Sequence, residues 1–474
     1  MIYSKSVKFL FAASLLSLVF QTVHALVIVE RGTSKSCELD SSGKLVYSKD
    51  SKGNRIPDFS YVGYHSGEKE IPDVPVKITL NPRQGDYSER LQKAVNLLSK
   101  LSPDKNGFRG AILLKRGKYQ INGSIVIQNS GIVLRGQGSG PDGTVLVAAG
   151  YGKKKHRRTL IKIGNSKNIK IDKSSRQPIT DNYIPIGSRS FHVDSASNFK
   201  PGDKIVVYRP STEEWIHSIG CDRLVPKWTN VFDTRWVKHG KGAGFYYHRH
   251  GSSREAYIPK RPNESWCEFL KRVPLSDDGK KFDTTHQWKA GEYDFYFERR
   301  ITDIKDSKIT IDAPIVHPIE QRFGGADVYR YSAPGRVTEV GIENLRLVSE
   351  FAKPVDGHPY GNPEKTKQSE NHAWHGIKIG KNTRNTWVRN VTGNYFGWSL
   401  VSASGKNATV QDCVNLGHAS KIQGGRRYPF MTNGQKNLFQ RCITFRGRHE
   451  FVTQRGTAGP NVFVDCVGFD SKSS

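Results

Sequence analysis

Three short segments near the C-terminal end of the chain repeat one pattern, in which a cysteine follows a polar residue and precedes an apolar one. The equivalent positions are 22, 29 and 24 residues apart, counted from Val391 to Cys413, Cys442 and Cys466. A period in the low twenties with β character is typical of one coil of a parallel β-helix, with loops in the longer steps. The segments are VQDCV (410–414), FQRCI (439–443) and FVDCV (463–467), and two more fit with valine in the cysteine place, VRNVT (388–392) with Val391 and LRLVS (345–349) with Val348.

The repeat also explains where three of the six cysteines fall. Equivalent positions on successive coils stack about 4.8 Å apart, so Val391, Cys413, Cys442 and Cys466 are predicted to form an inward ladder. A free cysteine packs as a small buried hydrophobic residue, and we expect reduced thiols in the ladder. The other three cysteines lie in irregular regions, which allows one disulfide among them: Cys37, Cys221 and Cys267.

One helical pattern precedes the β pattern. The segment 85–100 places Leu91, Ala94, Val95 and Leu98 on one face, with Asp86 and Glu89 spaced for a capping box. Short runs rich in β-branched residues follow, punctuated by glycine and asparagine. The sequence therefore predicts an all-β chain, a parallel β-helix whose open end is covered by one α-helix.

The first 25 residues have the pattern of a signal peptide. Lys5 and Lys8 precede an apolar run that is too short to favour a membrane anchor, and small residues stand at the cleavage positions. We expect a secreted protein, extracellular or periplasmic, with an N-terminal segment over 26–84 and the β-helix over 85–474. Within the latter, residues 222–287 are basic, aromatic and aperiodic, which predicts a long irregular insertion. Little sequence follows the last repeat, so we expect further coils or a separate cap.

Charge restricts the partner. The chain carries 73 Lys and Arg against 44 Asp and Glu, a net charge of +29, and removal of Lys5 and Lys8 leaves 29 − 2 = +27. Such an excess attracts polyanions. Secretion argues against nucleic acid as the partner, and the sequence contains no basic amphipathic helix that would favour binding to a membrane. We expect a monomer that binds an acidic polysaccharide, with a basic surface that serves only solubility as the alternative.

The N-terminal helix and RGAILLKRGKYQINGSIVIQNSGIVLRGQG, which follows it, resemble the cap and first coils of the pectate-lyase superfamily. FKPGDKIVVYRPSTEEWI, WKAGEYDFYFERRITDIKDSKITIDAPI, NHAWHGIKI, GGRRYPF and GRHEFVTQRGTAGPNVFVDCV resemble secreted, lyase-like proteins of that fold. The resemblance covers about residues 58–470 apart from 222–287. It implies a right-handed single-stranded parallel β-helix, a fold that hosts lyases, glycoside hydrolases and non-enzymatic adhesins.

Aligning the coils on the ladder also aligns the strand that precedes each ladder position. His375, Trp398, Arg427/Tyr428 and His449 then fall at or near the start of that strand in one column, with Arg427/Tyr428 and His449 roughly 5 Å apart. The sequence predicts a cationic and aromatic groove there, overhung by the loop GHASKIQGGRR. The aligned segments are HGIKI (375–379), WSLVS (398–402), YPFMT (428–432) and EFVTQ (450–454).

These residue types suit the cleavage of a uronic-acid polymer by β-elimination. Arginine binds a carboxylate through its planar fork, histidine can act as a base near neutral pH, and tyrosine can donate a proton. The candidate catalytic residues are His449, Arg427, Tyr428 and Arg426. The candidate substrate-binding residues are His375, Trp374, Lys421, Arg448, Arg455 and Trp398.

Two other functions stay open beside a lyase for a glycosaminoglycan-like polymer. A hydrolase needs a pair of carboxylates, and the repeat region offers only Asp412 and Asp465, two coils apart. A secreted protein that binds polysaccharide without cleaving it fits the same residues. No metal ligand set is assigned and no cofactor is certain, although some lyases of this fold use calcium.

Overall fold

The computed structural model describes residues 34–222, 244–248, 255–259, 261, 263, 288–352, 370–422, 424–454 and 456–471. The chain divides into two compact units, residues 1–56 and 57–474. In the first unit, β1 (Cys37–Leu39) and β2 (Leu45–Tyr47) form an antiparallel hairpin. The predicted signal peptide, Cys267 and Arg455 lie outside the described residues. No helix among the described residues is long and apolar enough to cross a membrane.

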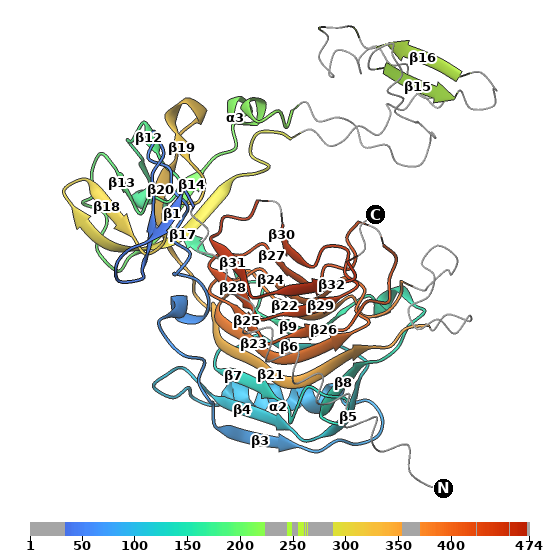
Figure 1. Cartoon of the computed structure of the whole chain (residues 1–474). Coiled ribbons are helices and arrows are strands. Elements are labelled where there is room, and N and C mark those ends of the chain that lie inside the picture. The colour runs from blue at the N-terminus through green and yellow to red at the C-terminus, as the bar shows by residue number, and fades with distance from the viewer. Residues whose placement is uncertain are drawn as a thin grey trace. The chain divides into compact units, whose positions relative to one another are not determined.

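Two parallel sheets form the body of the second unit (Figure 1). The six-stranded sheet contains β6 (Ile125–Ile127), β9 (Thr159–Ile163), β22 (His375–Ile379), β24 (Ser399–Ala403), β27 (Phe430–Thr432) and β30 (Phe451–Thr453). The thirteen-stranded sheet contains β3 (Val76–Leu80), β4 (Gly110–Leu114), β5 (Gly117–Ile121), β7 (Ile132–Arg135), β8 (Thr144–Ala148), β21 (Val337–Ser349), β23 (Thr383–Asn394), β25 (Thr409–Gln411), β26 (Val414–Asn415), β28 (Asn437–Gln440), β29 (Ile443–Phe445), β31 (Asn461–Val464) and β32 (Val467–Phe469).

From β22 onward the chain alternates between the two sheets, and each strand pairs in parallel with its equivalent on the next coil. Val388 pairs with Val410, Val410 with Phe439 and Phe439 with Phe463, which are the steps read from the cysteine repeat. A mostly β chain with parallel sheets is therefore confirmed. One detail was wrong, because Leu345 pairs with Val391 where Val348 was expected.

The space between the sheets holds the main hydrophobic core, which includes the cysteine ladder. Cys413 and Cys442 are buried in this core, and Cys466 is half-buried against it. All three are free thiols, as predicted. Cys37 and Cys221 are also free, so no disulfide joins them.

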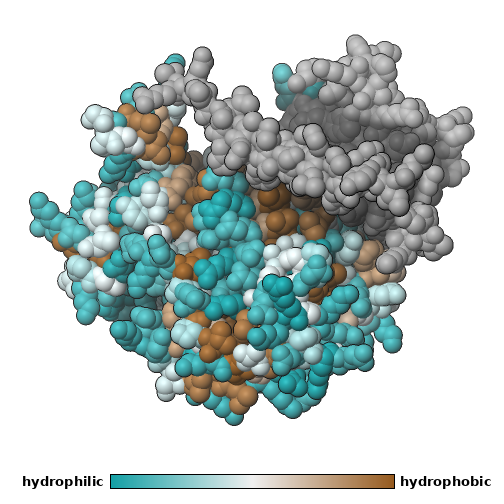
Figure 2. All heavy atoms as spheres, turned by 60° about the horizontal axis from the view of Figure 1, so that its bottom comes forward, coloured by the Kyte–Doolittle hydropathy of each residue, from teal (hydrophilic) through white to brown (hydrophobic). Residues whose placement is uncertain are grey.

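The predicted helix is α2 (Ser88–Lys100), and its apolar stripe packs into the same core. Asp86 accepts a hydrogen bond from the backbone N–H of Ser88 at 2.9 Å, so it satisfies one of the donors at the helix start. The capping box is wrong, because Glu89 is exposed and pairs with Lys93 at 2.7 Å. Figure 2 shows that the face nearest this end of the molecule is mostly hydrophilic, with apolar side chains in small patches.

The structure differs from the prediction over residues 170–222 and 288–332, which form antiparallel strands with a hydrophobic core of their own. The expected parallel stack is therefore interrupted well before residue 222. Alternation in β17, whose first residues are buried and exposed in turn, is typical of a sheet with one solvent face. The strands are β10 (Lys170–Ile171), β11 (Gln177–Pro178), β12 (Tyr183–Ile184), β13 (Ser190–His192), β14 (Lys204–Arg209), β17 (Phe295–Lys305), β18 (Lys308–Ile311), β19 (Ile319–Glu320) and β20 (Asp327–Ser332).

Helix α3 (Glu213–Ser218) precedes the segment predicted as an irregular insertion, 222–287. The described part of that segment includes an antiparallel pair, β15 (Gly244–His248) and β16 (Glu255–Pro259).

Candidate functional site

A row of aromatic rings lies along the N-terminal ends of the strands of the six-stranded sheet. The ring centroids of Trp374 and Trp398 are 5.9 Å apart, and His375 lies 5.2 Å from Trp398. Tyr428 lies 6.3 Å from Trp398 and 5.1 Å from His449. We call these five residues the aromatic column. Its members span four successive coils, from β22 to β30.

Backbone hydrogen bonds set the spacing of the column. The N–H of Trp398 donates to the Trp374 carbonyl at 2.8 Å, and the N–H of Tyr428 donates to the Trp398 carbonyl at 2.7 Å. The column residues stand just before positions such as Val401 and Phe430, which enter the core. The parallel ladder therefore continues past the strands and holds the rings about one strand spacing apart.

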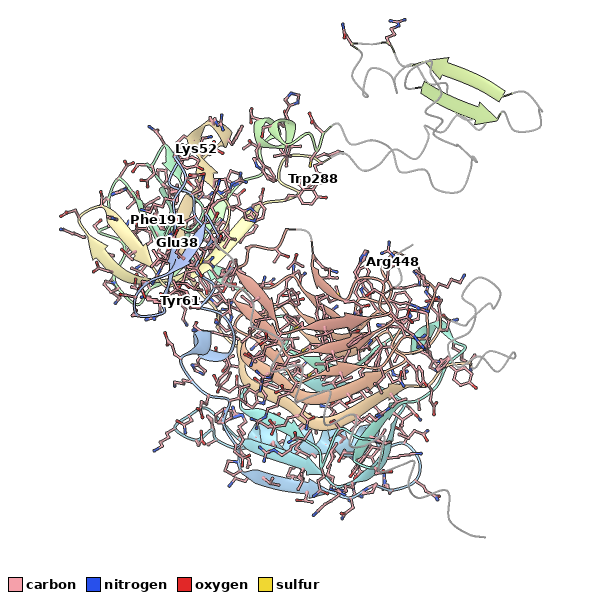
Figure 3. All side chains as sticks on the ribbon, viewed as in Figure 1. Glu38, Lys52, Tyr61, Phe191, Trp288 and Arg448 are labelled. Atoms are coloured by element: carbon pink, nitrogen blue, oxygen red, sulfur yellow. The ribbon has the colours of Figure 1, made fainter. Side chains whose placement is uncertain are left out.

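Arg448 joins the two column residues at the β30 end. Its Nη1 donates to the Tyr428 hydroxyl at 2.8 Å and approaches His449 Nε2 at 2.9 Å. Since a guanidinium can only donate, Nε2 must accept, and the neutral ring then carries its proton on Nδ1. Figure 3 shows Arg448 at the same end of the stack as β30. Tyr428, Arg448 and His449 are the candidate catalytic residues at this end, and we call them the catalytic trio.

The charge state of His449 follows from this contact. Partial burial and then the positive charge of Arg448 lower its pKa, against a smaller opposing effect of Glu450. The imidazole is therefore neutral near pH 7. A neutral imidazole can accept a proton, which is the first requirement of a general base.

His375 and Trp398 differ in how their ring nitrogens are paired. His375 is held by Ser399, whose hydroxyl lies 2.7 Å from Nδ1, and burial lowers the pKa of His375 to about 4. The Trp398 indole N–H is buried and has no hydrogen-bond partner among the described residues. Buried donors are nearly always paired, so this N–H is one of the few exceptions among the described side chains.

Arg426 lies at the other end of the column from the catalytic trio. Its Nε donates to the Glu370 carboxylate at 2.8 Å, and its guanidinium lies 5.2 Å over the Trp374 ring. Trp374 is itself held by the Glu370 carbonyl, at 2.8 Å from its Nε1. The sequence placed Arg426 beside His449, and the structure places it beside Trp374. That position suits binding rather than catalysis.

Arg427 does not reach the column either. It is buried, and its Nε and Nη2 donate to the Ser420 carbonyl, the first of them at 2.8 Å. Its guanidinium therefore closes the loop that carries Lys421, which is exposed. Arg427 was expected close to His449, but the arginine found there is Arg448. His372 and His418 are buried and hydrogen-bonded to the backbone carbonyls of Ala419 and Phe396.

The two arginines should respond differently to alanine. Arg427→Ala leaves the Ser420 carbonyl unpaired in the interior, and we expect a loss of about 1–3 kcal/mol of folding free energy. Arg448→Ala removes a half-buried side chain and should change stability by about 0.5 kcal/mol or less. Thermal denaturation of both variants measures the difference. A larger loss for Arg448→Ala would contradict the structural role given to Arg427.

The sequence analysis missed a group of cations beyond Trp374. Residues 153–158, KKKHRR, are consecutive basic residues. Arg157 lies 5.1 Å over the Trp374 ring. The signal was visible as a charge run, but it lies more than 200 residues before Trp374, and only the fold brings the two together.

The carboxylates near the column accept hydrogen bonds from other protein groups. Glu370 accepts from Arg426 and from the Lys421 backbone N–H, and Glu450 accepts from Thr444 and Ser471. Asp412 pairs with Arg441 at 2.6 Å. Among the described residues, no three His, Cys, Asp or Glu side chains group closely enough to hold a metal ion.

Comparison with known proteins gives a fold-level likeness only. No protein family and no curated protein matches the sequence. The tailspike protein gp49 from Pseudomonas phage LKA1 is 13% identical over 79% of this chain and 44% of its own length, with a TM-score of 0.38. The tailspike gp61 of Pseudomonas phage phi297 is 12% identical over 80% and 44%, with a TM-score of 0.39. The Gp54 tailspike of Acinetobacter baumannii bacteriophage AP22, solved with a capsular saccharide, is 9% identical over 80% and 55%, with a TM-score of 0.22.

The chain thus spans about half the length of these tailspikes. At such identities and scores the likeness carries no argument about activity. The class that the structure itself defines is a mostly β protein with two parallel sheets and an aromatic, cationic column along one of them.

Proposed function

We propose that this protein is a secreted polysaccharide lyase that cleaves a uronic-acid polymer by β-elimination, with glycosaminoglycans as the favoured substrates. We also propose that its parallel sheets close into a right-handed single-stranded β-helix of the pectate-lyase type. The observation that carries the activity is the catalytic trio, in which one guanidinium contacts both a phenol and a neutral imidazole.

The trio can supply each part of the reaction. When a substrate carboxylate draws the Arg448 guanidinium away from His449, the lone pair of His449 Nε2 becomes free. Nε2 then takes the proton from C5, alpha to the carboxylate, and the C–H electron pair becomes the C4=C5 double bond. The C4–O bond breaks, the leaving oxygen takes the electron pair of that bond, and the Tyr428 hydroxyl protonates this oxygen. Arg448 places its positive charge where the carboxylate gains negative charge as C5 loses its proton. Some lyases of the fold that the chain resembles use calcium to neutralise the carboxylate, and we assign this role to Arg448.

The rest of the column would hold the polymer. The Trp398 ring would pack against a sugar unit, and Trp374, which lies under the guanidinium groups of Arg157 and Arg426, holds these two cations beside the column. Arg426 adds a cation near Trp374, and exposed Lys421 lies on the same loop. The column is thus a candidate binding track that leads to the trio.

A protein that binds the polymer without cleaving it is the second candidate, because ring faces and cations along a track serve binding equally well. Hydrolysis is less well supported. It needs two carboxylates that flank the cleaved bond, and the described carboxylates nearest the column, Glu370 and Glu450, lie beside Trp374 and His449 at its opposite ends.

A substrate panel distinguishes these functions. Elimination leaves a double bond conjugated to the carboxylate, which absorbs in the ultraviolet. We expect such absorbance to grow when the protein is incubated with at least one glycosaminoglycan, alginate, pectate or ulvan, and new reducing ends to appear at the same rate. Reducing ends without absorbance would identify a hydrolase. Binding to a polymer with neither signal would identify a binding protein.

A further inference from the structure

The aromatic column continues at its β22 end into the basic run 153–158. The register pairs His375 of β22 with Thr159 of β9, so the run enters the next coil along the same sheet. Four strand spacings separate the coil of His449 from that of Thr159, roughly 19 Å along the sheet. The run therefore lies where a polymer bound at the catalytic trio would extend.

Direct contacts fix the run to the column. The N–H of Gly152 donates to the Asn371 carbonyl at 2.9 Å, and Arg157 Nε donates to the Asn371 side chain at 2.8 Å. Asn371 stands three residues before Trp374, and Arg157 lies over the Trp374 ring. The basic run and the first ring of the column thus form one continuous surface.

The cations of the run divide into structural and exposed groups. Arg158 donates to the carbonyls of Ile121, Ala149 and Gly123 at 2.7–2.8 Å, so its guanidinium serves the fold. The side chains of Lys153, Lys154 and Lys155 are exposed, and none of them forms an ion pair with a described residue. Three consecutive ammonium groups concentrate positive charge at this end of the column, which attracts anions.

A cavity lies beside these lysines. Its volume is about 470 Å³, and Lys155 and His156 line it with Gln120, Asn122 and Glu350. Glu350 is held there by the Gly150 N–H, which donates to it at 2.8 Å. Amide and cationic groups and one carboxylate, that of Glu350, thus surround a space that opens beside the run.

We propose that Lys153, Lys154 and Lys155 form a remote subsite for sulfate groups, so that the polymer cleaved at the trio is a sulfated uronate polysaccharide. This inference rests on the proposed function, because it takes the column as the path of the polymer. Lysine ammonium groups are compact point charges, without the planar fork that fits carboxylates. A polymer with one carboxylate per uronate carries one charge per sugar unit, whereas sulfate esters add further charges to each unit and so place more of them within one Debye length of about 8–10 Å.

The test uses Lys153→Gln, Lys154→Gln and Lys155→Gln combined in the full chain. The matched control combines Lys200→Gln, Lys305→Gln and Lys308→Gln, three exposed lysines of the antiparallel region with the same change in net charge. Affinity for heparin and for polygalacturonate, which carries carboxylates alone, is measured against salt concentration. The subsite variant should bind heparin about 10- to 100-fold more weakly and lose about two to three units of salt slope, because each lost contact removes nearly one released counterion.

Binding of the subsite variant to polygalacturonate should change about twofold or less. Equal losses on both polymers, or an equal loss of heparin affinity in the control, would overturn the proposal. A larger loss on duplex DNA than on heparin would overturn it in favour of a nucleic-acid surface. If the heparin-specific loss appears but no polymer gives ultraviolet absorbance, the subsite stands and the proposed lyase activity fails.

Discussion

His449→Ala should slow the growth of ultraviolet absorbance by about 10²- to 10⁴-fold, the usual contribution of a general base. His449 is exposed, and its ring touches Tyr428 and Arg448 outside the core. The variant should therefore fold and melt as the parent does. Initial rates on the best polymer of the panel, with thermal denaturation of the same samples, provide the measurement.

The matched control is His192→Ala, which removes another exposed histidine from the antiparallel region, where it pairs with Asp181 at 2.9 Å. That variant should retain the parent rate. Tyr428→Phe removes only the proposed proton donor and should also slow the reaction while leaving the ring in the column. Full activity of His449→Ala would refute the assignment of the base, whatever the fold.

The pH dependence of the rate has a defined sign. Because burial and Arg448 lower the pKa of His449 below its usual 6.5, the base stays neutral at pH 6.5 and above. The rate should fall only as pH drops through the lowered pKa. Arg448→Gln removes one of the two lowering causes, so the His449 pKa should rise, as an NMR titration of the ring would show without any need for activity.

The sequence predicted most of the parallel stack, because a repeat shows directly in residue spacing. The cysteine steps fixed which strands pair, and the register of β25, β28 and β31 follows them. The column could be predicted for the same reason, since aligning the coils on the cysteine positions also aligns the residues that precede them. The antiparallel region could not, because its strands share no period with the coils.

Residue roles within the column were harder to predict than its position. Arg427 and Arg448 stand at equivalent places on successive coils, before Tyr428 and His449 respectively. The two arginines differ only in the direction of their side chains. Arg427 has a positive φ of 56°, and its side chain pairs with the Ser420 carbonyl. Spacing gives no information on such a choice. The pairing of Glu370 with Arg426 was equally hidden, because 56 residues separate the partners.

Glu343→Ala should cost about 3–5 kcal/mol of folding free energy, the usual penalty for removing one partner of a buried ion pair. Glu343 is fully buried on β21, between Arg135 of β7 and Arg389 of β23. Its carboxylate accepts from Arg135 at 2.5 Å, from Arg389 at 2.6 Å and from the Trp387 indole at 3.0 Å. Without it, two guanidinium groups face each other across three strands.

The matched control is Glu89→Ala, the same substitution in an exposed pair with Lys93. That loss should be about 0.5 kcal/mol or less, because an exposed pair on a helix contributes little. Urea denaturation midpoints compare the two, and Glu343→Gln, which keeps the side-chain volume, serves if the alanine variant does not accumulate. Similar losses for Glu343 and Glu89 would show that the buried carboxylate does not join the strands. A large loss confined to Glu343 would show that this contact holds neighbouring coils in register, and with them the spacing on which the aromatic column depends.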